Sequence, residues 1–226
     1  MKKAIFIFAL TALILMTGCA GKDNSSASGA DSKTGSSASV SGGKITDIKG
    51  VIDYYNSVTE DESWQNETDY NKRIEALRLP EGTLESLSTE DLVEAILYYP
   101  LLNQWRHYGT CEEGIEALGK ELDTMQELQK RSDAAAVLLK RYADQKVYTQ
   151  SEIQNWDDED TTPYVQGYWI EDIEAIITQD YILDQMTDEQ RKQFNETAKQ
   201  KQTEKYASGV YSSGDLTPKV ILELAE

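Results

Sequence analysis

Hydrophobic residues recur at intervals of three and four along most of the chain beyond residue 87, which is the spacing of a helix face. The longest such series consists of Cys111, Ile115, Leu118, Leu122, Met125 and Leu128. A second face runs through the isoleucines of 170–177. Strand-like alternation is confined to short candidates around 147–148 and 210–211. The pattern therefore predicts an all-α fold.

Polar residues stand where helices would begin, because a side-chain oxygen at the first position can accept a hydrogen bond from the backbone N–H three residues on. We predict such starts at Ser88, Thr110, Ser132 and Thr187. Pro100 interrupts the first helix, and the apolar residues after it continue the buried surface. No repeat period links these helices, so we expect a compact multi-helix array and not a solenoid.

The amino terminus has the order of a secretory signal peptide. Basic residues at 2–3 precede an apolar run over 4–16, and small residues follow at 17–18. The apolar run is too short to span a bilayer comfortably. We therefore interpret residues 1–18 as a signal peptide that is removed.

Residues 15–19 resemble a lipobox, the motif at which bacterial lipoproteins receive diacylglycerol on a cysteine thiol before cleavage on its amino side. Met16 departs from the leucine usual at its position. The resemblance implies that Cys19 is the lipid-attachment residue and carries fatty acid such as palmitate. The alternative is an ordinary signal peptide or an uncleaved anchor that happens to contain Cys19.

The stretch that follows has the composition of a linker. Residues 20–43 are mainly Ser, Gly, Ala, Lys and Asp, with Val40 as the only large aliphatic residue, and cannot bury enough apolar surface to order themselves. A flexible coil of this length reaches roughly 25 to 30 Å. We divide the chain into the signal peptide, the lipidated cysteine and flexible linker over 19–44, and a helical extracytoplasmic domain over 45–226.

The chain is strongly acidic, with 40 acidic and 22 basic residues and a formal net charge of −18. This charge repels phosphate backbones, so we expect no nucleic-acid partner. It also argues against binding an anionic bilayer through a basic face. We expect the lipid anchor to hold the domain on the extracytoplasmic side of the cell membrane or at the cell surface.

The stretch over 87–102, LSTEDLVEAILYYPLL, resembles a group of uncharacterised bacterial lipoproteins and secreted proteins, as do the residues at 114–118 and 133–142. The resemblance covers about a quarter of the chain and implies export and a helical fold. That group has no assigned activity, so the resemblance implies no catalytic or binding residues.

His107 is the only histidine, and Cys19 and Cys111 are the only cysteines, which excludes a zinc site built from these residue types. Cys111 follows His107 by four residues, so a Cys–His nucleophile is one interpretation of the pair. The other interpretation makes Cys111 an inert thiol on an apolar helix face and His107 a partly exposed loop residue.

The densest group of carboxylates lies at 157–160. Neighbouring carboxylates cannot all point at one ion, and the run lacks the spacing and central glycine of an EF-hand loop. The sequence favours a solvated acidic turn over a calcium site. We expect neither a metal nor a cofactor.

Aromatic residues gather around the acidic run, and exposed rings there would be able to stack on sugars or hold a cationic or peptide ligand. The residues predicted to bind such a ligand are Trp156, Tyr164, Tyr168 and Trp169. The alternative is that these rings fill seams between helices, as we expect for Trp105.

No nucleophile elbow, phosphate-binding glycine loop or HExxH helix is present in the sequence. We predict a lipid-anchored extracytoplasmic lipoprotein that is not an enzyme and acts as a binding or surface-interaction (accessory) protein. A glycan, a peptide or an envelope protein would be its partner. The alternatives are a small cell-envelope hydrolase using carboxylates or the Cys–His pair, and a structural envelope spacer.

Overall fold

A computed structural model describes residues 44–154 and 162–211, with the side chains of 162–168 left out of the description. All of these residues belong to one of the two units into which the chain divides, Ser37–Glu226. The predicted signal peptide, Cys19 and nearly all of the linker lie outside the described residues.

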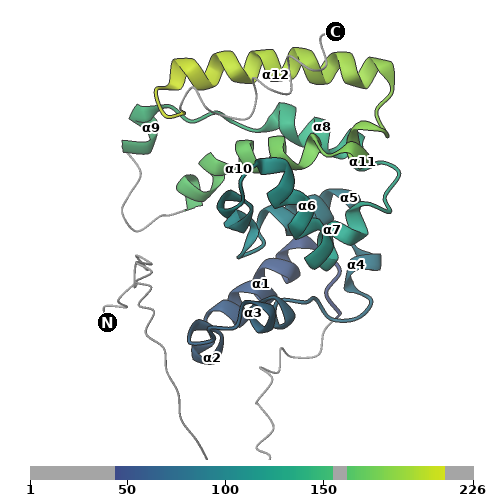
Figure 1. The fold of residues 1–226 in the computed structure, drawn as a ribbon, viewed down its shortest axis with the longest axis vertical. Coiled ribbons are helices and arrows are strands. Elements are labelled where there is room, and N and C mark those ends of the chain that lie inside the picture. Colours follow the sequence, from purple (N-terminus) through teal and green to yellow (C-terminus); the bar gives the residue numbers. More distant parts are fainter. Residues whose placement is uncertain (1–43, 155–161, 212–226) are drawn as a thin grey trace, which may run out of the picture. The chain divides into compact units, whose positions relative to one another are not determined.

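Helices follow one another along the whole described part of the chain (Figure 1). Their bounds are α1 (Ile48–Thr59), α2 (Glu62–Gln65), α3 (Tyr70–Ala76), α4 (Thr83–Ser86), α5 (Thr89–Leu97), the 3-10 helix η1 (Leu102–His107), α6 (Cys111–Glu121), α7 (Asp123–Leu128), α8 (Ala134–Asp144), α9 (Gln150–Gln154), α10 (Thr162–Ile177), α11 (Asp180–Leu183) and α12 (Asp188–Ser208).

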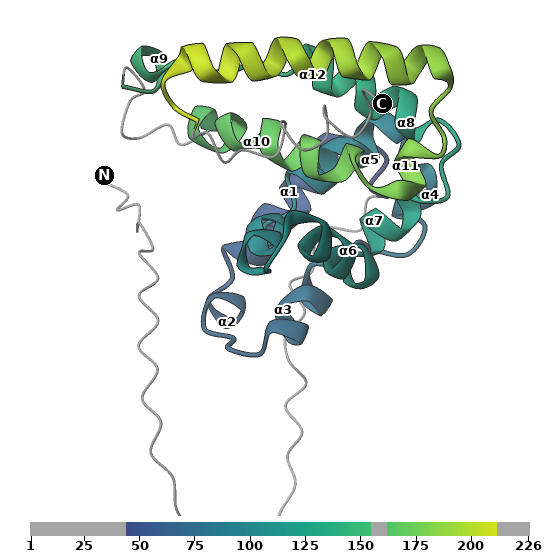
Figure 2. The ribbon, with the colours of Figure 1, turned by 45° about the horizontal axis from the view of Figure 1, so that its top comes forward.

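The predicted all-α class is confirmed, because residues 44–154 and 162–211 contain no strand. Helix α10 packs against α5, α6 and α8, and α12 packs against α8 (Figure 2). One hydrophobic core joins these helices. Its most deeply buried members include Leu92, Ile96, Leu118, Met125, Leu138, Ile173 and Phe194.

Three of the predicted helix starts are confirmed. The hydroxyls of Ser88, Thr110 and Thr187 each accept a hydrogen bond from the backbone N–H three residues later. At α12 the Gln190 side chain also accepts a hydrogen bond from the backbone N–H of Thr187, which completes a capping box. Local polar residues thus set the start of these helices.

The predicted interruption near Pro100 is also confirmed. Helix α5 ends at Leu97, and the chain continues through a turn into η1. Leu101, Leu102 and Trp105 are all buried there, so the apolar surface does continue beyond the proline. Trp105 fills a seam between helices, as expected.

The predicted cap at Ser132 is wrong. Helix α8 begins at Ala134, its N-cap is Asp133, and no side chain caps it. The Asp133 carboxylate instead accepts a hydrogen bond from the hydroxyl of Thr89 at 2.8 Å. A contact between α5 and the start of α8 has replaced local capping here.

The apolar series over 111–128 forms two helices and not one. Leu122 separates α6 from α7 with an extended backbone, at φ −90° and ψ 121°. Its side chain is nevertheless 1% exposed, so the hydrophobic spacing runs through the break unchanged.

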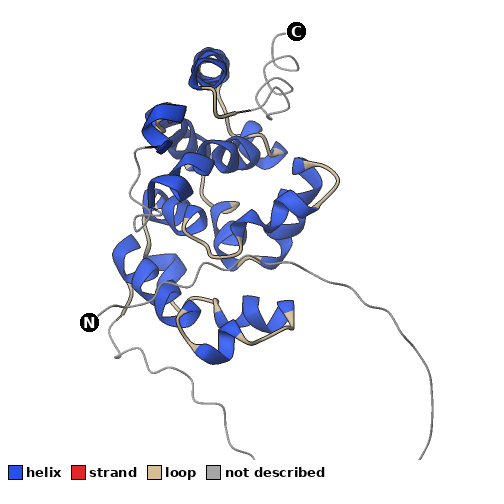
Figure 3. Ribbon diagram, turned by 90° about the vertical axis from the view of Figure 1, so that its left-hand side faces the viewer, coloured by secondary structure: helices blue, strands red, loops and turns tan. Residues whose placement is uncertain are grey.

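The two short strands considered from the sequence are not formed, because 147–148 and 210–211 have no regular secondary structure. Figure 3 shows only helices and loops in the described part of the chain.

Candidate functional site

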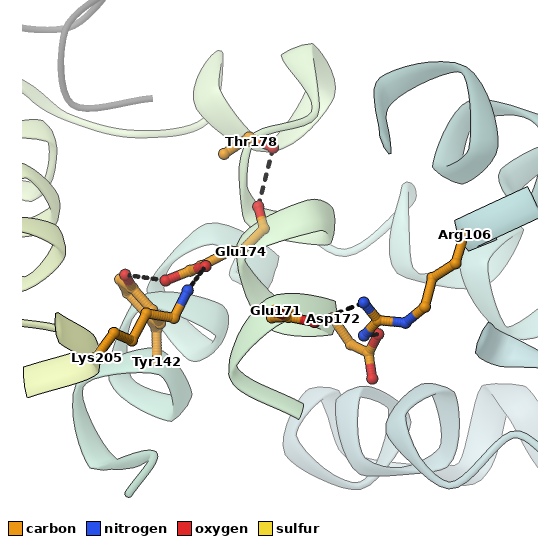
Figure 4. Close-up of polar contacts among 7 residues, drawn as sticks. All are labelled: Arg106, Tyr142, Glu171, Asp172, Glu174, Thr178 and Lys205. Atoms are coloured by element: carbon orange, nitrogen blue, oxygen red, sulfur yellow. Dashed lines mark hydrogen bonds and ion pairs between the residues drawn. The ribbon is translucent and has the colours of Figure 1, made fainter. Parts of the chain in front are cut away.

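Helix α10 carries two buried carboxylates, Asp172 and Glu174, whose residues are 6% and 2% exposed. Residues two apart on a helix project to nearly opposite sides, and Figure 4 shows the two side chains reaching different neighbours. An ionised carboxylate is removed from water at high cost unless cations or hydrogen-bond donors replace the water. The partners of these two carboxylates therefore determine whether they stabilise the fold or are available to a ligand.

Asp172 binds the 3-10 helix η1. The Trp105 indole Nε1–H and the Arg106 Nη2 both donate to Asp172 Oδ1 at 2.9 Å. Arg106 Nη1 donates to Glu171 Oε2 at 2.5 Å, so one guanidinium spans two neighbouring carboxylates of α10. The Arg106 guanidinium also lies over the Trp105 ring, 4.2 Å from its centroid.

Burial raises the pKa of Asp172 to about 6, even though the Arg106 charge and the Trp105 hydrogen bond lower it. The carboxyl group therefore takes up a proton in mildly acidic solution. Desolvation outweighs the ion pair at this position.

Glu174 binds α8 and α12 on the other side. The Tyr142 hydroxyl donates to Glu174 Oε1 at 2.8 Å, and Lys205 Nζ donates to Oε2 at 2.6 Å. The side chains of both ion-pair members are only 3% exposed. Burial raises the pKa of Tyr142, with a further contribution from the Glu174 charge, so its hydroxyl stays a donor. The backbone carbonyl of Glu174 accepts from Thr178 Oγ1 at 2.9 Å, as Figure 4 shows.

Helix α12 buries two lysines, Lys201 and Lys205, which the hydrophobic pattern did not predict. Lys201 Nζ donates to the Gln145 carbonyl at 2.5 Å, and Lys205 binds Glu174 as described. The spacing does contain a signal, because both lysines continue the helical face that carries Phe194 and Ala198. A long polar helix therefore packs on the core with cations on its buried face.

Trp169, one of the residues predicted to bind a ligand, is 5% exposed. Its ring packs edge-on against Tyr98, with centroids 4.8 Å apart, and the Arg141 guanidinium lies 5.5 Å from the Trp169 ring centroid. For this residue the structure supports the packing alternative, because little of the ring is open to a ligand. The other side chains predicted to bind a ligand lie outside the described residues, and they are those of Trp156, Tyr164 and Tyr168.

His107 and Cys111 do not form a hydrogen bond in the structure as described. His107 is exposed at the end of η1, and Cys111 is half-buried at the start of α6. Burial raises the pKa of the Cys111 thiol to about 12, against a lowering influence of Arg106. A thiol with this pKa is almost wholly protonated at neutral pH and is a poor nucleophile.

A shallow pocket of about 360 Å³ lies beside the first turn of α1. Asp47 and Asp53 line it, but Asp47 accepts the backbone N–H of Gly50 and Asp53 is paired with Lys49. The hydroxyl of Tyr54, which also lines it, donates to two backbone carbonyls. The two carboxylates and the tyrosine hydroxyl that line this pocket are thus already bound within the protein.

Residues 44–154 and 162–211 contain neither a metal-binding cluster nor a helix that could cross a membrane. No group of three or more His, Cys, Asp or Glu side chains is placed to hold a metal ion. None of the helices is both long enough and apolar enough to cross a membrane. The acidic run at 157–160, weighed above as a calcium site, lies outside the described residues.

Comparisons of the chain with protein-family models, curated proteins and solved structures gave no match. The resemblance to bacterial lipoproteins and secreted proteins therefore stays a prediction from the sequence.

Proposed function

We propose that this protein is a lipid-anchored, extracytoplasmic binding protein, acting as an accessory or surface-interaction protein without catalysis. The observation that carries the proposal is the lipobox-like sequence at 15–19, preceded by a basic and then an apolar segment. The linker composition of 20–43 supports it, since such a linker would hold the domain away from the lipid surface.

The chemistry of the described residues favours binding over catalysis. The buried carboxylates of α10 are bound to Arg106, Tyr142 and Lys205, which join helices to one another. The one described cysteine, Cys111, has a thiol pKa raised to about 12. A hydrolase would need a carboxylate pair facing a cleft or an activated thiol. The buried carboxylates of α10 instead join helices, and the Cys111 thiol is not activated.

Mass spectrometry of the protein purified from its native membrane tests the anchoring. We expect a chain that starts at Cys19 and carries diacylglycerol on that residue. In cells fed labelled palmitate, Cys19→Ala should abolish labelling, whereas Cys111→Ala should leave it unchanged. An unmodified Cys19, or residues 1–18 still attached, would refute the proposal.

The partner of this binding protein is a glycan, a peptide or an envelope protein in our proposal. Screening the full chain against glycans and peptides, with Trp156→Ala as the variant, tests the contribution of the predicted aromatic residues. Unchanged binding by the variant would eliminate Trp156 from the site. A structural envelope spacer is the second candidate, and the burial of Trp169 favours it.

A further inference from the structure

The carboxylates that join η1 to α10 outnumber the cations beside them. The Arg106 guanidinium donates to Glu171 at 2.5 Å and to Asp172 at 2.9 Å, and the side chains of these two acids are 14% and 9% exposed. Among the described residues, no second Lys or Arg forms an ion pair with either acid. We call Trp105, Arg106, Glu171 and Asp172 the η1–α10 junction, and Figure 4 shows its three charged members. One positive charge there faces two negative charges.

Ionisable groups on the other helices around α10 do not balance this charge. Cys111 of α6 lies near the junction, but burial raises the pKa of its thiol to about 12, so the thiol is neutral. Arg141 of α8 is paired with Glu94 of α5. Glu174 reaches the other side of α10 and is paired with Lys205 of α12 (Figure 4). The junction therefore keeps one uncompensated negative charge when both of its acids are ionised.

A proton is the countercharge that the junction lacks. Removing an ionised carboxylate from water is costly unless a positive charge accompanies it. Burial raises the pKa of Asp172 to about 6 against the lowering influence of Arg106, and the Glu171 charge acts in the same direction as burial. The Arg106 side chain is 31% exposed, so solvent reaches the edge of the junction.

The 3-10 helix η1 contacts α6 through its backbone and α10 through the junction. A Cβ atom added to Gly114 of α6 would lie 2.3 Å from the Trp105 carbonyl oxygen, so the two backbones touch. Towards α10, the Trp105 indole and the Arg106 guanidinium both donate to Asp172 Oδ1. A local separation of η1 from α10 would let water solvate this carboxylate and return its pKa towards the ordinary value of 3.8.

We propose that the attachment of η1 to α10 is a pH-dependent contact, which a proton on the Asp172 carboxyl group tightens and loss of that proton loosens. The attached state holds the proton more tightly than the separated state, so acid favours attachment. The stability that protonation contributes is complete below about pH 4 and is lost as the pH rises through about 6. This regulation goes beyond the proposed binding function and does not depend on the lipid anchor.

Hydrogen–deuterium exchange of the full chain in detergent, followed by mass spectrometry at pH 5 and pH 7, tests this inference. After correction for the intrinsic pH dependence of exchange, protection of the η1 amides should be about tenfold lower at pH 7, because separation is linked to the loss of one proton. The η1 amides should also exchange before those at the centres of α8 and α10, which would show that η1 separates without global unfolding. Equal protection of η1 and α10, or η1 protection that does not change with pH, would overturn the inference.

Variants of the junction assign the change to its carboxylates. Asp172→Asn keeps an acceptor for Trp105 and cannot titrate, so the tenfold change should disappear. Glu171→Gln removes the second negative charge, so the change should move to lower pH and shrink between pH 5 and pH 7. An imidazole also changes its charge in this interval, and His107→Gln at the exposed end of η1 is therefore the matched control, which should keep the tenfold change.

The inference is wrong if the change persists in Asp172→Asn or vanishes in His107→Gln. An unchanged ratio in Glu171→Gln also refutes it, and this variant decides the question alone if Asp172→Asn does not fold.

Discussion

The carboxylates of α10 and those at the α6–α7 break lie in the same acidic domain, yet their surroundings differ. Asp172 and Glu174 each receive hydrogen bonds from a neutral donor and from a cation of the protein. Around the α6–α7 break, which Glu121, Leu122 and Asp123 form, the hydroxyl oxygen of Tyr55, Oγ1 of Thr124 and Oε2 of Glu121 are buried without a hydrogen-bond partner. Because an unpaired buried polar atom costs stability, the hydrogen bonds of the first region should stabilise the fold more than the unpaired groups of the second.

The largest effect that distinguishes the two regions is expected from Lys205→Met. This change leaves Glu174 buried without its ammonium partner and should lower the free energy of unfolding by about 3 to 5 kcal/mol. Urea denaturation followed by circular dichroism measures it, with Lys199→Met on the exposed face of α12 as the control. Equal effects of the two variants would mean that the ion pair does not hold α12.

A pair of Tyr→Phe changes compares the two regions directly, since both residues are almost completely buried. Tyr142→Phe removes a donor to Glu174 and should cost about 1 to 3 kcal/mol of unfolding free energy. Tyr55→Phe removes a hydroxyl that has no partner and should be neutral or stabilising. Similar losses of unfolding free energy in both variants, measured by urea denaturation, would contradict the difference between the two regions.

The pH dependence of stability tests the α10 side alone. The folded-state pKa of Asp172 is raised to about 6 from the ordinary value of 3.8. The folded state therefore holds this proton more tightly than the unfolded state, and the stability contributed by protonation is lost as pH rises between about 4 and 6. From pH 5 to pH 7 the Asp172 contribution should fall by about 1 kcal/mol.

Asp172→Asn should remove that contribution, so the difference between parent and variant should change with pH. Unfolding free energies at pH 5 and pH 7 supply the comparison. If the unfolding free energies of parent and variant differ by the same amount at both pH values, Asp172 does not titrate between pH 5 and pH 7.

The smallest effects are expected from two Thr→Val changes. Thr89→Val removes the hydrogen bond to Asp133 and should cost about 1 kcal/mol. Thr124→Val keeps the shape of a fully buried side chain whose hydroxyl has no partner, and should change stability by less than about 0.5 kcal/mol. Thermal unfolding of the parent and the two variants checks both predictions.

Local signals in the sequence predicted much of the fold. Ser88, Thr110 and Thr187 begin helices because each hydroxyl acts on a backbone N–H only three residues away. Ser132 does not cap α8 because the helix begins at Ala134 with Asp133 as the N-cap residue, whose carboxylate binds Thr89, a residue more than forty positions earlier. The break at Leu122 could not be read from the spacing, since the side chain stays buried through it.

The α10 site was harder to predict, because its partners come from distant parts of the chain. Asp172 and Glu174 do stand among isoleucines, and Lys201 and Lys205 continue the face of Phe194, so charged residues in apolar series were the available signal. Which cation meets which carboxylate depends on how α8, α10 and α12 pack. The sequence pattern instead predicted aromatic ligand-binding residues, and one of them, Trp169, is buried against Tyr98.

The two buried lysines of α12 also determine how far along its axis this helix can slide. Lys201 and Lys205 are one helical turn apart, and they meet different acceptors, the Gln145 carbonyl and the Glu174 carboxylate. A slide by four residues would bring one lysine to the acceptor of the other. It would place Thr197 or Gly209, neither of which carries a charge, opposite the second acceptor. Only one longitudinal position satisfies both acceptors, so α12 has a unique register even though most of its length is polar.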